Sequence, residues 1–217
     1  RTARRTQIFQ HLVRSAMITM NTTTSKEEAL RWVFFHDLFR DPTPEQWEWL
    51  RSEAVQQAWA VLVDEYCGDI PKKMPLPDSQ EQFHEEFIAA FEVGAPAPPC
   101  PLIESHWNKR DSTPRILHEN MLFYRRFGLE LRSSANETAD HLRHQLEFVH
   151  HLYVLADRYD EDSQTSQIGM AKHDFIERHL SSWIPSAAAA FGEECPDWWA
   201  SDWMTLLAAF ISNQIQT

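Results

Sequence analysis

The stretch ADHLRHQLEFVHHLYVLADRY, residues 139–159, decides the fold class of this chain. It predicts one long helix, and Asn136 and Glu137 just before it are suited to cap that helix. Further helix signals follow one another on both sides, and no convincing strand lies between them. The sequence therefore predicts an all-α protein, a single-domain bundle of about eight or more helices without a repeat of fixed period.

Caps and breakers mark the other predicted helices. Ser25 and Glu28 form a capping-box pattern, and three further segments open at Pro44, Pro114 and Pro196. The polar stretch at residues 160–167 is expected to be a loop. The expected helical segments are residues 8–20, 25–41, 43–68, 79–94, 113–128, 139–159, 170–183 and 198–215.

A proline-rich segment interrupts the helices near the middle of the chain. Four prolines occupy six positions from Pro96 to Pro101, so this segment forms neither a helix nor a central strand. We expect a hinge or functional loop within residues 96–112, and a rigid linker is the alternative that composition supports equally. The predicted domain then has an N-terminal half, about residues 1–95, and a C-terminal half, residues 113–217.

The charge balance excludes some partners. The chain has 20 basic and 32 acidic residues, a formal net charge of −12 with neutral histidines. Such a surface repels nucleic acid and anionic lipid and favours cationic partners, although solubility alone is the simpler explanation. No run of eighteen apolar residues occurs, so no membrane insertion is expected.

Several enzyme and cofactor classes lack their sequence signatures. Only five glycines are present, and neither a GxGxxG nor a GxxxxGK[ST] string occurs, which excludes the common nucleotide-binding loops. There is no GxSxG nucleophile elbow. The three cysteines, Cys67, Cys100 and Cys195, are scattered without a CxxC pair, which indicates a reducing compartment.

Eleven histidines raise the question of a metal site. Glu147 with His150, and Glu81 with His84, have the Glu-x-x-His spacing of di-iron helical bundles. A chain this rich in both residue types forms such pairs by chance, and the two further inward-facing glutamates of a di-iron site are not evident. The sequence therefore predicts no metal, no cofactor, no catalytic residue and no enzymatic activity, with a di-iron enzyme as an alternative.

Aromatic residues are more numerous than a bundle of this size needs for its core. The chain has nine tryptophans and thirteen phenylalanines. Some of them are expected to line a groove or a partner interface, and the alternative is an ordinary core with an aromatic rim. An acidic helical protein with an aromatic groove suits a basic and apolar peptide. A passive helical adaptor is a third possibility.

The first twenty residues allow two interpretations. Arg4-Arg5 followed by Ile8-Phe9 is similar to a twin-arginine export signal. However, polar and charged residues interrupt the place of the apolar core that such a signal has. Apolar residues recur every four positions from Ile8 to Met20, and this spacing favours an amphipathic helix.

Three blocks of sequence resemble the TorD/DmsD family of redox-enzyme maturation chaperones. YRRFG followed by ETADHLRHQLEFVHHL resembles the family's aromatic-FG and E-P-x-DHL blocks, and FEVGAPAPPCPLIESHWNKR resembles its PPW and S-x-W/Y block. FIERHLSSWIP is similar to the C-terminal F-x-x-HL-x-x-W. The blocks cover roughly residues 25–191 in order. The matching positions of the first two blocks are Phe91, Gly94, Pro98, Pro99, Ser105, Trp107, Arg110, Tyr124, Phe127, Gly128, Glu137, Asp140, His141, Leu142, Leu146, Glu147 and Phe148.

Some positions depart from the family pattern. Thr138 stands where the family usually has proline, Cys100 where it has an aromatic residue, and Gln145 where it has glutamate. The string CPLIE also lengthens the interval between the two prolines and the serine. These departures concern the fine specificity for a peptide.

The resemblance implies an all-helical cytoplasmic chaperone without a cofactor. Its partner would be the catalytic subunit of a molybdenum-cofactor oxidoreductase. The chaperone would bind the twin-arginine leader of that subunit, its body or both, and assist cofactor insertion before export. The implied oligomeric state is a monomer or a domain-swapped dimer.

The resemblance also implies a peptide-binding region at the PP loop and the Asp140-His141 pair. Asp140 would pair with a leader arginine beside a hydrogen bond from His141, or alternatively tie down the proline loop. Trp107 and Tyr124 would receive the apolar segment or stack on an arginine, or alternatively pack in the hinge. The expected peptide-binding residues are Asp140, His141, Trp107, Tyr124, Pro98, Pro99, Ser105, Arg110, Gln145 and Phe91.

Overall fold

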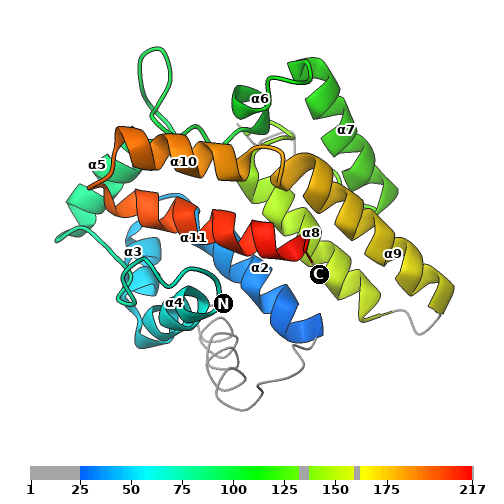
Figure 1. Cartoon of the computed structure of the whole chain (residues 1–217), viewed down its shortest axis with the longest axis horizontal. Coiled ribbons are helices and arrows are strands. Elements are labelled where there is room, and N and C mark those ends of the chain that lie inside the picture. Colours follow the sequence, from blue (N-terminus) through cyan, green and yellow to red (C-terminus); the bar gives the residue numbers. More distant parts are fainter. Residues whose placement is uncertain (1–24, 132–136, 159–161, 217) are drawn as a thin grey trace.

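The structure is a computed structural model, and it describes residues 25–131, 137–158 and 162–216. These residues form helices and contain no β-strand, so the all-α class is confirmed (Figure 1). The predicted helix at residues 8–20 lies outside them. The elements are α2 (Ser25–Leu38), α3 (Pro44–Arg51), α4 (Glu53–Tyr66), α5 (Gln80–Phe91), α6 (Glu104–Trp107), α7 (Thr113–Arg126), α8 (Leu142–Ala156), α9 (Asp162–Phe175), the π-helical η1 (Ile176–Leu180), α10 (Ile184–Glu194) and α11 (Trp199–Gln214).

Local signals fix several helix ends as predicted. The Thr43 hydroxyl accepts a hydrogen bond from the Gln46 N–H at the start of α3, and the Ser79 hydroxyl accepts one from Gln82 at the start of α5. Gly128 follows α7 with φ 78°, the left-handed conformation that favours glycine after a helix end.

The prediction of one continuous helix over residues 43–68 is wrong, because Ser52 divides this segment into α3 and α4. Ser52 has extended backbone, with ψ 143°. Its N–H and its hydroxyl both donate to the Trp49 carbonyl, at 3.1 and 2.7 Å. A serine side chain that binds nearby backbone competes with the helical hydrogen bonds, which explains the break.

Other boundaries also differ from the predictions, and the helix α10 was not predicted. Residues 162–167 of the expected polar loop belong to the backbone of α9. The helix expected over 139–159 begins only at Leu142, with His141 as its N-cap in place of Asn136 and Glu137. The Leu142 N–H donates to the Leu102 carbonyl, 2.9 Å away. A tertiary contact therefore sets this helix start.

The helices pack around one continuous hydrophobic core. Helix α2 lies along α8, α10 lies against α11, and α4 also contacts α11 (Figure 1). Six of the nine tryptophans are buried, and the ring of Phe35 stacks on that of Phe210 at 4.8 Å. Most of the aromatic excess therefore fills the core, which corresponds to the core-and-rim alternative.

The proline-rich segment connects α5 to α6, and two hydrogen bonds hold its C-terminal end. In Figure 1 it forms the long loop that projects at the top of the view. The Cys100 N–H donates to the Ala90 carbonyl at 2.9 Å, and the Trp107 indole N–H donates to the Pro101 carbonyl at 2.8 Å. Whether the segment acts as a hinge between two halves stays a prediction.

Candidate functional site

The end of the proline-rich segment pairs with the residues before α8. Ile103 and His141 form an isolated antiparallel bridge, in which the Glu104 N–H donates to the Asp140 carbonyl at 3.1 Å. This pairing brings together two of the sequence blocks that lie about 35 positions apart. It places the start of the short helix α6 directly against the start of α8.

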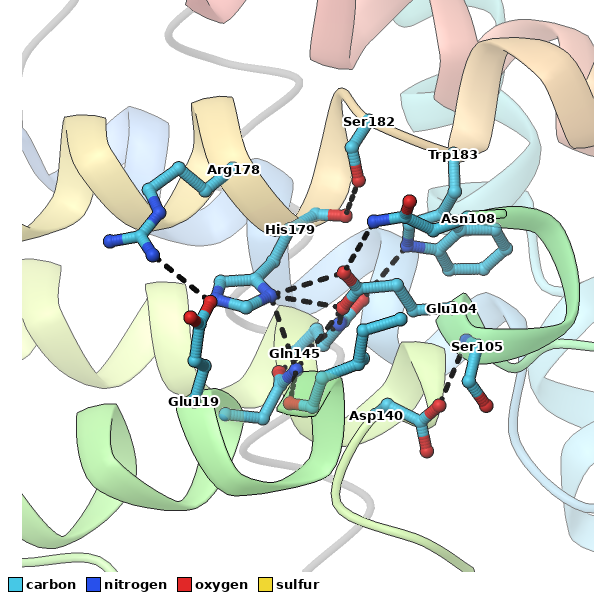
Figure 2. Close-up of polar contacts among 12 residues, drawn as sticks. Glu104, Ser105, Asn108, Glu119, Asp140, Gln145, Arg178, His179, Ser182 and Trp183 are labelled. Atoms are coloured by element: carbon cyan, nitrogen blue, oxygen red, sulfur yellow. Dashed lines mark hydrogen bonds and ion pairs between the residues drawn. The ribbon is translucent and has the colours of Figure 1, made fainter. Parts of the chain in front are cut away.

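Asp140 holds this junction with its side chain. The carboxylate is fully buried, and its Oδ2 accepts a hydrogen bond from the Ser105 N–H at 2.9 Å (Figure 2). Its Oδ1 accepts one from the Thr138 hydroxyl at 2.5 Å. Both oxygens are therefore engaged within the protein, an arrangement that corresponds to the alternative in which Asp140 ties down the proline loop.

Glu104 is the centre of a buried polar cluster beside this junction. Its side chain is 1% exposed, and its Oε2 accepts hydrogen bonds from Gln145 Nε2 at 2.6 Å and Asn120 Nδ2 at 3.1 Å. His179 Nδ1 lies 3.0 Å from the same oxygen, and Asn108 Nδ2 lies 3.4 Å from Oε1. Figure 2 shows the side chains of Asn108, Gln145 and His179 converging on the carboxylate. A buried carboxylate is tolerated because several donors surround it.

The cluster connects four helical elements. His179 comes from the π-helical turn η1, which residues 181–183 connect to α10. The Gln145 carbonyl oxygen on α8 accepts from the Trp183 indole N–H at 3.2 Å, and Tyr124 on α7 donates its hydroxyl to the Ala139 carbonyl at 2.8 Å. The cluster thereby fixes α6, α7, α8 and η1 relative to one another (Figure 2).

His141 joins the buried junction to the surface. Its Nδ1 accepts a hydrogen bond from the Arg143 N–H at 3.2 Å, so the ring caps α8 in its neutral form. Burial, helped by the neighbouring Arg143 guanidinium, lowers the pKa of His141 to about 3. The imidazole therefore acts as a neutral structural group at physiological pH.

A cavity of about 860 Å³ opens beside His141, at the start of α8. It is bordered by the C-terminal end of α2, the residues after α5 and α7, and the first two turns of α8. Its lining residues are His36, Asp41, Glu92, Tyr124, Leu129, Glu130, Leu131, Glu137, His141, Arg143, His144 and Glu147. We call this space the acidic cavity, because five carboxylates line it against one arginine.

The charges of the acidic cavity are only partly compensated. Arg143 lies 2.6 Å from an Asp41 oxygen and 2.8 Å from a Glu137 oxygen. Within the described part of the chain, Glu92, Glu130 and Glu147 make no ion pair. The pKa of Glu92 is raised by burial and by the negative charges of Asp41 and Glu137. The cavity therefore carries excess negative potential and is suited to a cationic group.

The structure brings some of the expected peptide-binding residues together and leaves others apart. Asp140, Ser105, Tyr124 and Gln145 meet in the buried junction, and His141 and Tyr124 border the acidic cavity. The others lie elsewhere: Phe91 is a core residue, Trp107 is half-buried against the proline-rich segment, Pro98 and Pro99 are half-buried in it, and Arg110 is exposed.

Sequence reasoning missed the residues at the centre of the cluster. Glu104 and His179 both stand inside the quoted blocks, in LIESHW and FIERHL, but they received no role. Glu104 follows the apolar residues Leu102 and Ile103. A glutamate beside apolar residues is the one local signal that could have indicated a buried carboxylate. Asn120 has no such signal.

The two Glu-x-x-His pairs do not assemble a metal site. His150 Nδ1 lies 3.0 Å from the Ala29 carbonyl oxygen, and His84 Nδ1 lies 3.1 Å from the Pro42 carbonyl oxygen. Across residues 25–131, 137–158 and 162–216, no three histidine, cysteine, aspartate or glutamate side chains are placed to hold a metal ion. The helices of these same ranges include none that is both long and apolar enough to cross a membrane.

Comparisons with known proteins place the junction within a shared region. The family model described as nitrate reductase delta subunit matches residues 50–189. The perchlorate reductase assembly chaperone protein of Dechloromonas aromatica (strain RCB) is 31% identical over 138 residues, which are 63% of this chain and 62% of the relative. No solved structure matches the chain significantly.

Two further relatives have similar names. The chlorate reductase assembly chaperone protein of Ideonella dechloratans is 27% identical over 171 residues, 76% of this chain and 78% of the relative. The chaperone protein TorD of Vibrio cholerae serotype O1 (strain ATCC 39315 / El Tor Inaba N16961) is 38% identical over 68 residues, 31% of this chain and 29% of the relative. The chain thus matches less than two thirds of the length of the perchlorate reductase assembly chaperone protein, and also less than two thirds of the length of TorD.

Proposed function

Because this chain belongs to the nitrate reductase delta subunit family, we propose that it is a non-enzymatic assembly chaperone for the catalytic subunit of a molybdenum-cofactor oxidoreductase. The resemblance to redox-enzyme maturation chaperones is confirmed by relatives named as chaperones of perchlorate and chlorate reductase assembly. The chaperone would bind its client in the cytoplasm, before export, and assist cofactor insertion.

The acidic cavity is the part of the protein that we propose binds the client's twin-arginine leader. The observation that carries this proposal is the excess of carboxylates in the cavity, three of which have no ion-pair partner among the described residues. Two adjacent guanidinium groups would supply the missing positive charge, and each can form two hydrogen bonds with one carboxylate. Glu92, Glu130 and Glu147 are the available acceptors, because Arg143 already occupies Asp41 and Glu137.

Asp140 would serve the same site by positioning. Its bonds to Ser105 and Thr138 hold the start of α8, and thereby the orientation of His141 at the cavity wall. The cluster around Glu104 would keep α6, α7 and α8 in register, so that the cavity exists before the peptide arrives. A preformed site loses less entropy on binding.

Calorimetry with a synthetic leader peptide tests the proposal. A synthetic twin-arginine leader peptide of a molybdenum-cofactor reductase subunit is titrated into wild type, Glu147→Gln and the control Glu119→Gln. Glu119 is paired with Arg178 at 2.9 Å and does not line the cavity. We expect about tenfold weaker binding, about 1.4 kcal/mol, for Glu147→Gln and no change for the control.

A second peptide, with both arginines replaced by glutamine, completes a double-mutant cycle. Wild type should bind it more weakly, and Glu147→Gln should lose little further affinity. Additive losses would show that the arginines do not meet Glu147. If wild type binds neither peptide, the leader-binding proposal fails and a passive adaptor becomes the better explanation.

A further inference from the structure

A second cavity lies on the same helix pair as the acidic cavity. It has a volume of about 520 Å³ and opens where the beginning of α2 meets the end of α8. Ala29, Leu30, Tyr153 and Val154 give it an apolar wall. Lys26 and Asp157, 3.9 Å apart, stand at its edge with exposed side chains. We call it the apolar groove.

The acidic cavity and the apolar groove open on the same face of the α2/α8 pair. On α2, His36 lines the cavity and Ala29 lines the groove, seven residues apart. On α8, Glu147 lines the cavity and Val154 lines the groove, also seven residues apart. Seven residues make nearly two full turns, so each pair shares one face of its helix. Helices α2 and α8 lie side by side along this distance (Figure 1).

The distance between the two sites is short. Seven helical residues correspond to about 10 Å along the axis, which about three residues of extended peptide span. One extended chain can therefore reach both sites at once. The charge of the two sites differs sharply, because carboxylates surround the first and apolar side chains form the wall of the second.

We infer that the apolar groove binds the apolar segment that follows the two arginines of the leader. This inference rests on the proposed function, and it adds a second binding site and a direction to it. The arginines lie at the N-terminal end of α8 and the apolar segment at its C-terminal end, so the bound leader runs parallel to α8. Affinity then depends on the arginines, on the apolar residues and on the short spacing between them.

Variants of Val154 test the groove in the full chain. Val154→Glu places a charge in the apolar wall, and Val154→Thr keeps the shape of the side chain while replacing one methyl group by a hydroxyl. The matched control is Leu122→Glu, which adds the same charge on α7 at a side chain that is 50% exposed. We expect at least tenfold weaker leader binding for Val154→Glu, a smaller loss for Val154→Thr and no change for Leu122→Glu.

Peptide variants separate the possible outcomes. A leader whose apolar residues are replaced by serine should bind wild type weakly and lose no further affinity with Val154→Glu. Six residues inserted after the arginines should weaken wild-type binding about tenfold. If wild type binds the leader in an arginine-dependent way and Val154→Glu binds it equally well, the inference alone is overturned. If wild type does not bind the leader, the proposed function is overturned and the inference with it.

Another segment of this chain is the competing occupant. A synthetic peptide of residues 1–24 carries the apolar spacing from Ile8 to Met20. If this peptide binds wild type but not Val154→Glu, and the serine-substituted leader binds wild type as well as the original leader, the groove belongs to that segment. That result would overturn the inference.

Discussion

Removing the Glu104 carboxylate should destabilise the protein strongly. Four donors, from Asn108, Asn120, Gln145 and His179, lie within 3.4 Å of its two oxygens. Glu104→Ala leaves them buried without this acceptor. Truncating one partner of such a buried charged cluster costs about 3–5 kcal/mol, and a single hydrogen bond to a charged group contributes about 1.5–3 kcal/mol.

Glu104→Gln should be less harmful. It keeps one acceptor oxygen and places an amide where the second oxygen was, so we expect a loss of about 1–3 kcal/mol. Asn108 can rotate its amide, and His179 can change tautomer, to accept from the new N–H groups. The ranking of wild type, glutamine and alanine therefore reports the hydrogen bonds in addition to the packing.

The assay is urea denaturation followed by far-ultraviolet circular dichroism, with thermal melting in parallel. For a protein of this size, a loss of 1 kcal/mol lowers Tm by roughly 2–4 °C, so Glu104→Ala should melt roughly 6–20 °C lower. The control is Glu119→Gln, a partly exposed carboxylate beside Arg178 and Arg115, which should change stability by less than about 1 kcal/mol. A Glu104→Ala variant as stable as this control would refute the role of Glu104 as the centre of the cluster.

Three further predictions follow from single residues. Burial lowers the pKa of His141 to about 3, so on acidification the unfolded chain binds a proton at this histidine before the folded protein does. As the pH falls below about 6.5, the free energy of unfolding should therefore decrease by about 1.4 kcal/mol per pH unit. His141→Asn keeps the cap and should flatten this dependence in denaturation series; an unchanged slope would contradict the assignment. Asp140→Ala should cost about 2–4 kcal/mol in urea denaturation because the Ser105 N–H and Thr138 hydroxyl lose their acceptors, and Asp140→Asn, which keeps one acceptor, should cost less than half of that. Gly128→Ala should cost about 1–2 kcal/mol by the same measurement, since φ is 78° while an added Cβ has open space; a neutral effect would exclude backbone strain there.

Local sequence determined the elements wherever a cap or breaker acts within one turn. Ser79 and the Thr43-Pro44 pair start their helices as predicted, because their interactions involve residues at most three positions away. The break at Ser52 was not predicted, because serine occurs inside helices as well as at their ends. Its conformation depends on which carbonyl its hydroxyl binds.

The candidate site was predicted in part. The resemblance located the proline-rich segment and the Asp140-His141 pair, and the structure shows that these two segments pair through Ile103 and His141. The sequence left open whether Asp140 is exposed to a peptide or buried. Its burial depends on Ser105, 35 positions away, which no local pattern reveals.

The sequence by itself determined that this chain is helical, acidic and related to a family of chaperones, because composition, caps and family blocks are properties of neighbouring residues. Only the tertiary structure decided which polar residues are buried together and which carboxylates remain unpaired. Glu104 and His179 are 75 positions apart, yet they lie within 3.0 Å of each other. Such contacts form when helices pack against one another. Packing brings together side chains that are far apart along the chain, and no local sequence pattern predicts which of them will meet.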